Sequence, residues 1–252
     1  MRPPSVHHAA SRMVATAVAD QHEEPHGLMT TSPATATART TDAGVDTTDY
    51  AVIHRSIRSA GHAIATAATT LRHDDHARMD AFVRYWQGHV GEIFSHHGVE
   101  DDIFFPALRE RAPETAQVLD QLDAEHHRLD ELMEACRAAI EGVVTGDGPA
   151  EAARRLRELA GVMDEHLDLE DQEIVPRFSE HFSAPEYEAL TKAAIKQVGL
   201  GKQAAFTVPY IGFWATEEER VALLGSAPLP FRILYRLTRA RHARLTELAL
   251  AI

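Results

Sequence analysis

One pattern occurs twice in the sequence: a histidine, a glutamate four residues later and a proline six residues after that glutamate. The two copies lie 70 residues apart at all three positions and are His96-Glu100-Pro106 and His166-Glu170-Pro176. A further histidine precedes each copy, His54 before the first and His126 before the second. A duplicated helix pair with matched His and Glu positions predicts a metal site at the centre of a four-helix bundle.

The spacing of apolar and polar residues predicts four long helical segments, at residues 49–71, 77–105, 113–144 and 149–173. Asp49 and Asp75 are the expected N-caps, and the Gly-Asp-Gly-Pro run at 146–149 is a clear break. No segment shows the sustained alternation of a strand. Because the connections are short, neighbouring helices should be antiparallel. The predicted fold is therefore all-α, an up-down-up-down four-helix bundle with extra C-terminal helices.

Three regions are expected along the 252 residues: a disordered tail at 1–47, the bundle at 48–182 and a C-terminal extension at 183–252 that packs on the bundle. The tail is rich in Thr, Ala and Ser and has little to bury. Capping boxes at Ser183 and Thr216 each predict a helix start, and a last helix is expected at 229–250. That helix carries five arginines and one acid, Glu247. It either docks a protein partner or folds back onto the acidic bundle, and we favour the second interpretation.

The composition limits the partners that the protein can have. A formal net charge of -13 argues against nucleic acid, because a phosphate backbone needs a basic surface. A single cysteine, Cys136, allows no disulfide within the chain, which suits a reducing cytoplasm. No stretch approaches 18 uninterrupted apolar residues, so no membrane span is expected. We therefore expect a cytoplasmic protein.

Six residues on the inward faces of the four helices are the predicted metal ligands: His54, His96, Glu100, His126, His166 and Glu170. A lone helical histidine is more often exposed or packed in a core, but two copies in register favour a metal site. Four imidazoles and two carboxylates suit iron or manganese. They are too rich in nitrogen for Ca²⁺ or Mg²⁺ and lack the thiolates of many structural zinc sites. Two carboxylates that can bridge predict a dinuclear centre.

Residues next to these ligands have predicted supporting roles. His97 and His127 lie about 100° around the helix from the ligand that each follows, so we expect them to be outside the ligand set or exposed. Asp101 and Asp171 are expected to accept hydrogen bonds that orient ligating imidazoles.

Residues 96–106 and 166–176 resemble the two signature segments of the hemerythrin-like (HHE, cation-binding) family. Residues 54–58 and the pair Glu125-His126 resemble its first-helix and third-helix segments. The resemblance covers about residues 49–180, and the extension resembles that of actinobacterial members. It implies a four-helix bundle holding a non-haem, usually di-iron, centre that reacts with O₂, H₂O₂ or NO. By match to these motifs, the six residues named above become ligands of two iron ions, with manganese or zinc as substitutes.

The sequence departs from the oxygen-carrying members of that family. Their pattern demands a second histidine on the third helix, four residues from the first. Here Leu122 and Asp130 occupy the positions four away from His126. Both Glu170 and Asp171 are present on the fourth helix, and symmetry with Glu100 favours Glu170 as the ligand. One fewer nitrogen ligand weakens the case for reversible O₂ carriage and favours redox chemistry.

Three functions remain open. The leading prediction is an enzyme that removes H₂O₂ by catalase-like or peroxidase-like chemistry, a role in oxidative stress. A second is a module that senses O₂, NO or iron, with its bound state read through the C-terminal helices. A third is a di-iron oxidase for an organic substrate. An apolar pocket between the bundle and the C-terminal helices would favour the third.

Overall fold

A computed structural model of the chain describes residues 45–252, which form helices and no strand. The all-α prediction is confirmed. The tail predicted at residues 1–47 lies outside the described residues except for its last three positions. Within the described part, no helix is both long and apolar enough to cross a membrane.

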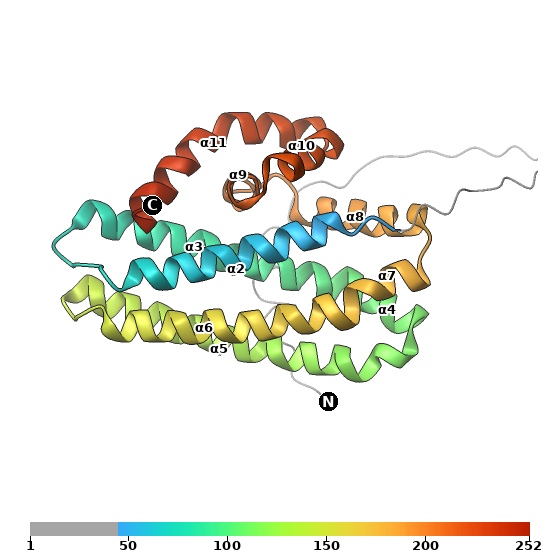
Figure 1. Cartoon of the computed structure of the whole chain (residues 1–252), viewed down its shortest axis with the longest axis horizontal. Helices are drawn as coiled ribbons and strands as arrows, with labels where there is room; N and C mark the ends of the chain where they lie inside the picture. The colour runs from blue at the N-terminus through green and yellow to red at the C-terminus, as the bar shows by residue number, and fades with distance from the viewer. Residues whose placement is uncertain (1–44) are drawn as a thin grey trace, which may run out of the picture. The chain divides into compact units, whose positions relative to one another are not determined.

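Four long helices run antiparallel to one another, each in the opposite direction to the one before it (Figure 1). They are α2 (Thr48–Ala68), α3 (His76–Val99), α5 (Ala116–Thr145) and α6 (Ala150–Leu169). Asp75 caps α3 by accepting a hydrogen bond of 3.2 Å from the backbone N–H of Arg78, as predicted. The prediction for Asp49 was wrong: Thr47 holds the N-cap position of α2, and Asp49 lies in the first helical turn. Gly146 ends α5 in the left-handed region, at φ 113°.

Both signature segments continue beyond the long helices through a π-helical turn. α3 passes through η1 (Glu100–Phe104) into α4 (Phe105–Arg111), and α6 passes through η3 (Glu170–Ile174) into α7 (Val175–His181). In each turn the backbone N–H reaches five residues back, from Phe105 to Glu100 and from Val175 to Glu170. Pro106 and Pro176 stand at the start of the continuing helices, where a missing N–H costs little. The prolines therefore mark a change of helical register and not an end.

Two apolar clusters fill the bundle, one on each side of the level at which the predicted ligands lie. Ile57, Ile93, Leu129 and Met163 belong to the first cluster, three residues away from His54, His96, His126 and His166 respectively. The second cluster contains Val99, Leu122 and Ile174. A short 3₁₀ turn, η2 (Pro113–Thr115), connects the two halves of the bundle.

The C-terminal segment contains α8 (Ala184–Val198), α9 (Ala204–Trp214), α10 (Glu217–Ser226) and α11 (Leu229–Leu250). Both predicted capping boxes are present, at the starts of α8 and α10. α9 and α11 pack against α2 and α3 (Figure 1). α9 approaches α3 so closely that a Cβ at Gly88 would collide with the ring of Phe206, and one at Gly91 would collide with Gln203. Two of the glycines of α3, Gly88 and Gly91, are therefore explained by this contact.

Candidate metal centre

All six predicted ligands come together inside the bundle, and each side chain is at most 8% exposed. Each long helix contributes one histidine: His54 lies on α2, His96 on α3, His126 on α5 and His166 on α6. Glu100 and Glu170 are the first residues of the two π-helices. The π-turn begins at the glutamate in both copies. π-turns inside α-helices occur frequently at functional sites.

The two carboxylates lie between two groups of imidazoles. One oxygen of Glu170 is 3.3 Å from Nε2 of His54 and 3.8 Å from Nε2 of His96. Its other oxygen is 3.0 Å from Nε2 of His166 and 3.9 Å from Nε2 of His126. Glu100 repeats the arrangement, with one oxygen 3.4 Å from His96 and the other 3.7 Å from His126. Each carboxylate therefore faces both groups, which is the geometry of a bridging ligand.

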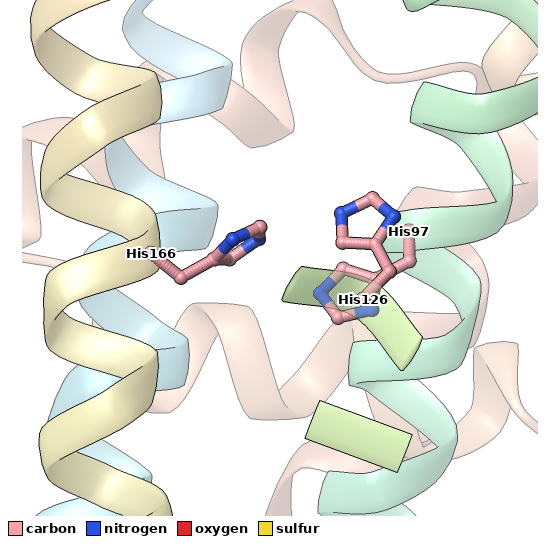
Figure 2. Close-up of side chains that lie close together, drawn as sticks. All are labelled: His97, His126 and His166. Atoms are coloured by element: carbon pink, nitrogen blue, oxygen red, sulfur yellow. The ribbon is translucent and has the colours of Figure 1, made fainter. Parts of the chain in front are cut away.

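His97 is a seventh member of the cluster. Its side chain is only 2% exposed, and its ring stacks on His126 at 3.9 Å between centroids. Figure 2 shows His97, His126 and His166 converging from three helices. One ligand atom from each of these histidines lies within 4.8 Å of the other two, and the same holds for the group His54, His96, Glu100 and Glu170. The expectation that His97 stays outside the ligand set does not fit this position, whereas His127 is exposed as predicted.

Helix geometry explains why His97 lies inside the cluster together with His96. Two consecutive residues lie about 100° apart on a helix, so they can stand on either side of the inward direction. His96 turns toward His54 of α2, with ring centroids 5.0 Å apart, while His97 turns toward His126 of α5. The consecutive histidines His96-His97 were a signal for this residue, but the same pair at His126-His127 has an exposed second member, so the pair alone does not identify a buried one. His97 adds a third imidazole to the group of His126 and His166, to which α5 contributes only His126.

Three acidic side chains fix the orientation of three imidazoles. Nδ1 of His54 donates to Asp171 at 2.7 Å, and Nδ1 of His126 donates to Asp101 at 3.0 Å. Both contacts were predicted. Nδ1 of His166 donates to Glu125 at 3.0 Å, a role that was not predicted. A proton held on Nδ1 leaves Nε2 unprotonated and free to bind a metal ion.

The polar atoms at the centre fit a bound cation. Among the described residues, eight buried atoms of the cluster have no hydrogen-bond partner: Nε2 of His54, His96, His97, His126 and His166, Oε2 of Glu100, and both carboxylate oxygens of Glu170. A buried polar atom without a partner costs about 1–3 kcal/mol, so this many in one place would be costly without a ligand. Metal ions bound by these nitrogen and oxygen atoms remove that cost.

The pKa values of the cluster reflect two carboxylates crowded among imidazoles. Burial and the nearby Glu170 raise the pKa of Glu100 to about 7. Burial opposes ionisation of Glu170 too, but His166, His126 and His96 outweigh it and hold its pKa well below the usual range. Burial and the adjacent imidazoles lower the pKa of His97 well below 6.5, so this ring is neutral, the form that binds metal. Tyr50 donates a buried hydrogen bond of 2.9 Å to Glu100 and completes the wall of the site.

Comparison with known proteins identifies the family. The hemerythrin HHE cation binding domain matches residues 47–178, which include all seven clustered residues. No curated protein and no solved structure matches the chain. The match spans more than half of the chain and coincides with the four-helix bundle and its buried His/Glu cluster. The protein therefore belongs to the hemerythrin HHE cation-binding domain family, whose members bind a metal ion, typically iron.

Proposed function

We propose that the chain binds two iron ions at this cluster and uses them to remove H₂O₂. His54 and His96 would hold one ion, His97, His126 and His166 the other, and Glu100 and Glu170 would bridge them. The observation that carries the proposal is the position of both carboxylates, each with one oxygen facing each imidazole group. Manganese or zinc could replace iron in this donor set.

The space beside the site supports a small substrate. A cavity of about 10 Å³ lies within three residues of the ligands along three helices, lined by Ile57, Ile93 and Met163 among others. This is room for one molecule the size of water. H₂O₂, O₂ and NO, with two heavy atoms each, come closer to that size than an organic substrate does. An apolar pocket between the bundle and the C-terminal helices would favour an organic oxidase, whereas the large groove of this protein lies between α3 and α5.

In this proposal the protein residues position the metals and control protons. Bound iron supplies Lewis acidity and redox capacity for the reaction, in which one H₂O₂ is reduced to two waters and a second is oxidised to O₂. Asp101, Asp171 and Glu125 keep three imidazoles in the metal-binding tautomer. The Tyr50 hydroxyl donates to Glu100 at 2.9 Å. Burial and the nearby Glu100 and Glu170 hold the pKa of Tyr50 well above its usual value, so the hydroxyl stays protonated and orients that carboxylate.

The first test is the metal content of untagged protein from iron-replete cells. We expect about two irons per chain, and O₂ release on addition of H₂O₂ to the loaded protein. Four histidines near the N-terminus could bind metal weakly, so the count is repeated after substitution of His7, His8, His22 and His26 by alanine. Less than one iron per chain after anaerobic Fe(II) loading would refute the dinuclear proposal. Two irons without peroxide turnover would refute only the enzymatic part.

A substitution at His97 tests the seventh ligand. We expect His97→Ala to weaken binding of one of the two ions by more than tenfold, because even the loss of an orienting partner costs roughly 10- to 100-fold. Titration with Fe(II) against a competing chelator measures this. The matched control is His127→Ala. His127 follows His126 on α5 as His97 follows His96 on α3, and its side chain is exposed. Unchanged binding of both ions in His97→Ala would remove His97 from the ligand set.

One observation favours the sensor as the second candidate. The hydroxyl of Tyr210 on α9 donates to the carbonyl of Ser56 at 3.0 Å, two residues beyond His54. A shift of α2 on binding of O₂ or NO would reach α9 through this contact. Hydrogen exchange of α9 in the iron-loaded protein, with and without NO, tests it: equal exchange in both states would exclude a signal through α9.

A further inference from the structure

A long groove lies between α3 and α5, two bundle helices that contact each other at few points along their length. Its volume is about 760 Å³, and its α3 side extends from His76 to Phe94, about 27 Å at 1.5 Å per residue. Met79, Val83, Val90 and Ile140 belong to its apolar lining. Two further apolar side chains in it, Phe94 and Val144, are 43% and 51% exposed. The groove is therefore an apolar surface that the rest of the described chain does not cover.

The edges of this groove are acidic. Four carboxylates line it, those of Asp80, Asp130, Glu134 and Glu141, against two arginines, Arg84 and Arg137. One of these cations serves two of the acids, because Arg137 pairs with both Glu134 and Glu141. The groove would favour an occupant that is apolar on one side and positively charged at its borders.

The outer face of α11 has those properties. Leu229, Ile233 and Leu237 stand four residues apart and are 65%, 48% and 76% exposed. The buried residues of the same helix, among them His242 and Thr246, all lie in its C-terminal part, beyond this stripe. Arg232 and Arg236 flank this stripe, and the helix continues with Arg239, Arg241 and Arg244.

These five arginines differ from most others in the chain. Arg109, Arg111, Arg154 and Arg177 each pair with an acidic side chain. Within the described residues, none of the five on α11 makes a hydrogen bond or an ion pair, although α11 folds back against the bundle. The whole chain carries a net charge of -13, so this helix is the part of the surface that attracts an acidic partner.

We propose that the outer face of α11 docks into the α3–α5 groove of a second copy of this chain. The leucine and isoleucine stripe meets the apolar lining, and the flanking arginines meet the carboxylates of the edges, as in other helix-in-groove contacts. The stripe from Leu229 to Leu237 spans about 12 Å, and the helix as far as the exposed Leu248 spans about 28 Å, close to the length of the groove. Each copy carries both surfaces, so two copies can exchange helices reciprocally or a longer assembly can form.

Sedimentation of the full-length, metal-loaded protein tests the proposal. We expect wild type to associate with rising concentration, and added salt to weaken the association. Two charge-reversed variants separate the surfaces. The helix variant carries Arg232→Glu, Arg236→Glu and Arg239→Glu, and the groove variant carries Asp80→Lys, Glu134→Lys and Glu141→Lys. Each alone should raise the dissociation constant at least tenfold. The control variant reverses three exposed glutamates outside the groove, Glu110, Glu165 and Glu188, and should associate like wild type.

An equimolar mixture of the helix and groove variants gives the decisive result. The reversed helix then meets the reversed groove, and the native helix meets the native groove, so association should return. Metal content and circular dichroism confirm that each variant folds. A wild type that stays monomeric at 100 μM, or a mixture that fails to associate, overturns the proposal. So does binding of wild type, but not of the helix variant, to vesicles containing phosphatidylglycerol without self-association, because α11 would then face a lipid surface.

Discussion

At the scale of single residues, the site depends on acids that hold imidazoles in place. Asp171 accepts from Nδ1 of His54 with one oxygen and from Arg58 with the other, at 2.7 and 2.9 Å. Partial burial would raise the pKa of Asp171, but these two hydrogen bonds outweigh it and lower that pKa. Asp171 therefore remains a carboxylate, the stronger acceptor for an imidazole N–H.

Replacement of this carboxylate tests the orienting role. Asp171→Asn should lower metal affinity roughly 10- to 100-fold, with the ligands themselves unchanged. Competition with a chelator of known affinity measures the loss. Asp168→Asn is the control, because Asp168 also pairs with Arg58, at 2.9 Å, and is 61% exposed. Equal losses in both variants would assign the effect to Arg58 or to surface charge, and not to the orientation of His54.

At the scale of elements, the contact between α3 and α9 buries two titratable side chains outside the metal site. Burial lowers the pKa of His89 to about 3, and this imidazole donates from Nδ1 to the hydroxyl of Tyr210 at 2.9 Å. Burial raises the pKa of Glu92 to about 7, although a hydrogen bond from Thr207 of α9 opposes the shift. In this contact, Glu92 is the group whose ionisation the fold opposes near neutral pH.

The pH dependence of stability tests this interface. The folded protein holds the Glu92 proton up to pH about 7, and an unfolded chain releases it near 4.3. Stability should therefore fall as pH rises between these values and stay low above them. Glu92→Gln removes this penalty and keeps an acceptor for Thr207. Its stability relative to wild type should rise from near zero at pH 4.5 to a few kcal/mol at pH 8.

Denaturant unfolding of metal-free protein at pH 4.5, 6 and 8 gives these differences. The His89 contribution rises with pH up to about 6.5, but both proteins share it, so it cancels in the comparison. Glu131→Gln, at an exposed position on α5, should show no such trend. A constant difference between Glu92→Gln and wild type across the range would mean that Glu92 is ionised in the fold throughout.

The bounds of most helices could be predicted from the sequence, whereas the π-turns and α9 could not. The last helix, 229–250, has the predicted bounds, and the four long helices differ from prediction by a few residues at their ends. Apolar periodicity and caps act over many residues, so they are visible in sequence. A π-turn depends on one backbone hydrogen bond that reaches five residues back, which leaves no periodic signal. α9 was not predicted, because Pro209 and Gly212 interrupt it and its stability comes from contact with α3.

The predicted ligands show the same contrast between features that the sequence reveals and features that it does not. His54, His96, Glu100, His126, His166 and Glu170 were predicted to converge because symmetry between the two copies survives any small error in helix position. His97 and Glu125 break that symmetry: the second copy has Leu167 where the first has His97, and Ile53 precedes His54 where Glu125 precedes His126. Their contacts depend on how far each helix rotates about its own axis, which repeat spacing alone does not determine.

At the scale of the whole molecule, the metal centre lies between two apolar clusters and joins all four long helices. The buried imidazoles and carboxylates of these helices lie against one another whether or not a cation is bound. Without metal, the unpartnered nitrogen and oxygen atoms oppose packing of the bundle at its centre. With metal, the same atoms bind the helices to one another. Iron should therefore act as a structural component of the bundle as well as a reactive one.

Thermal unfolding with and without metal tests this coupling. A ligand at 100 times its dissociation constant stabilises the folded state by about 2.7 kcal/mol. For a chain of this size, that corresponds to a rise in Tm of roughly 5–10 °C on iron loading, reversed by a chelator. The variant Glu100→Gln, Glu170→Gln keeps the shape of the site and its imidazoles but loses both bridging charges, so its Tm should rise much less with iron than that of wild type. A similar rise in that variant would place the stabilising metal elsewhere, and the helices would then be held at their centre by packing alone.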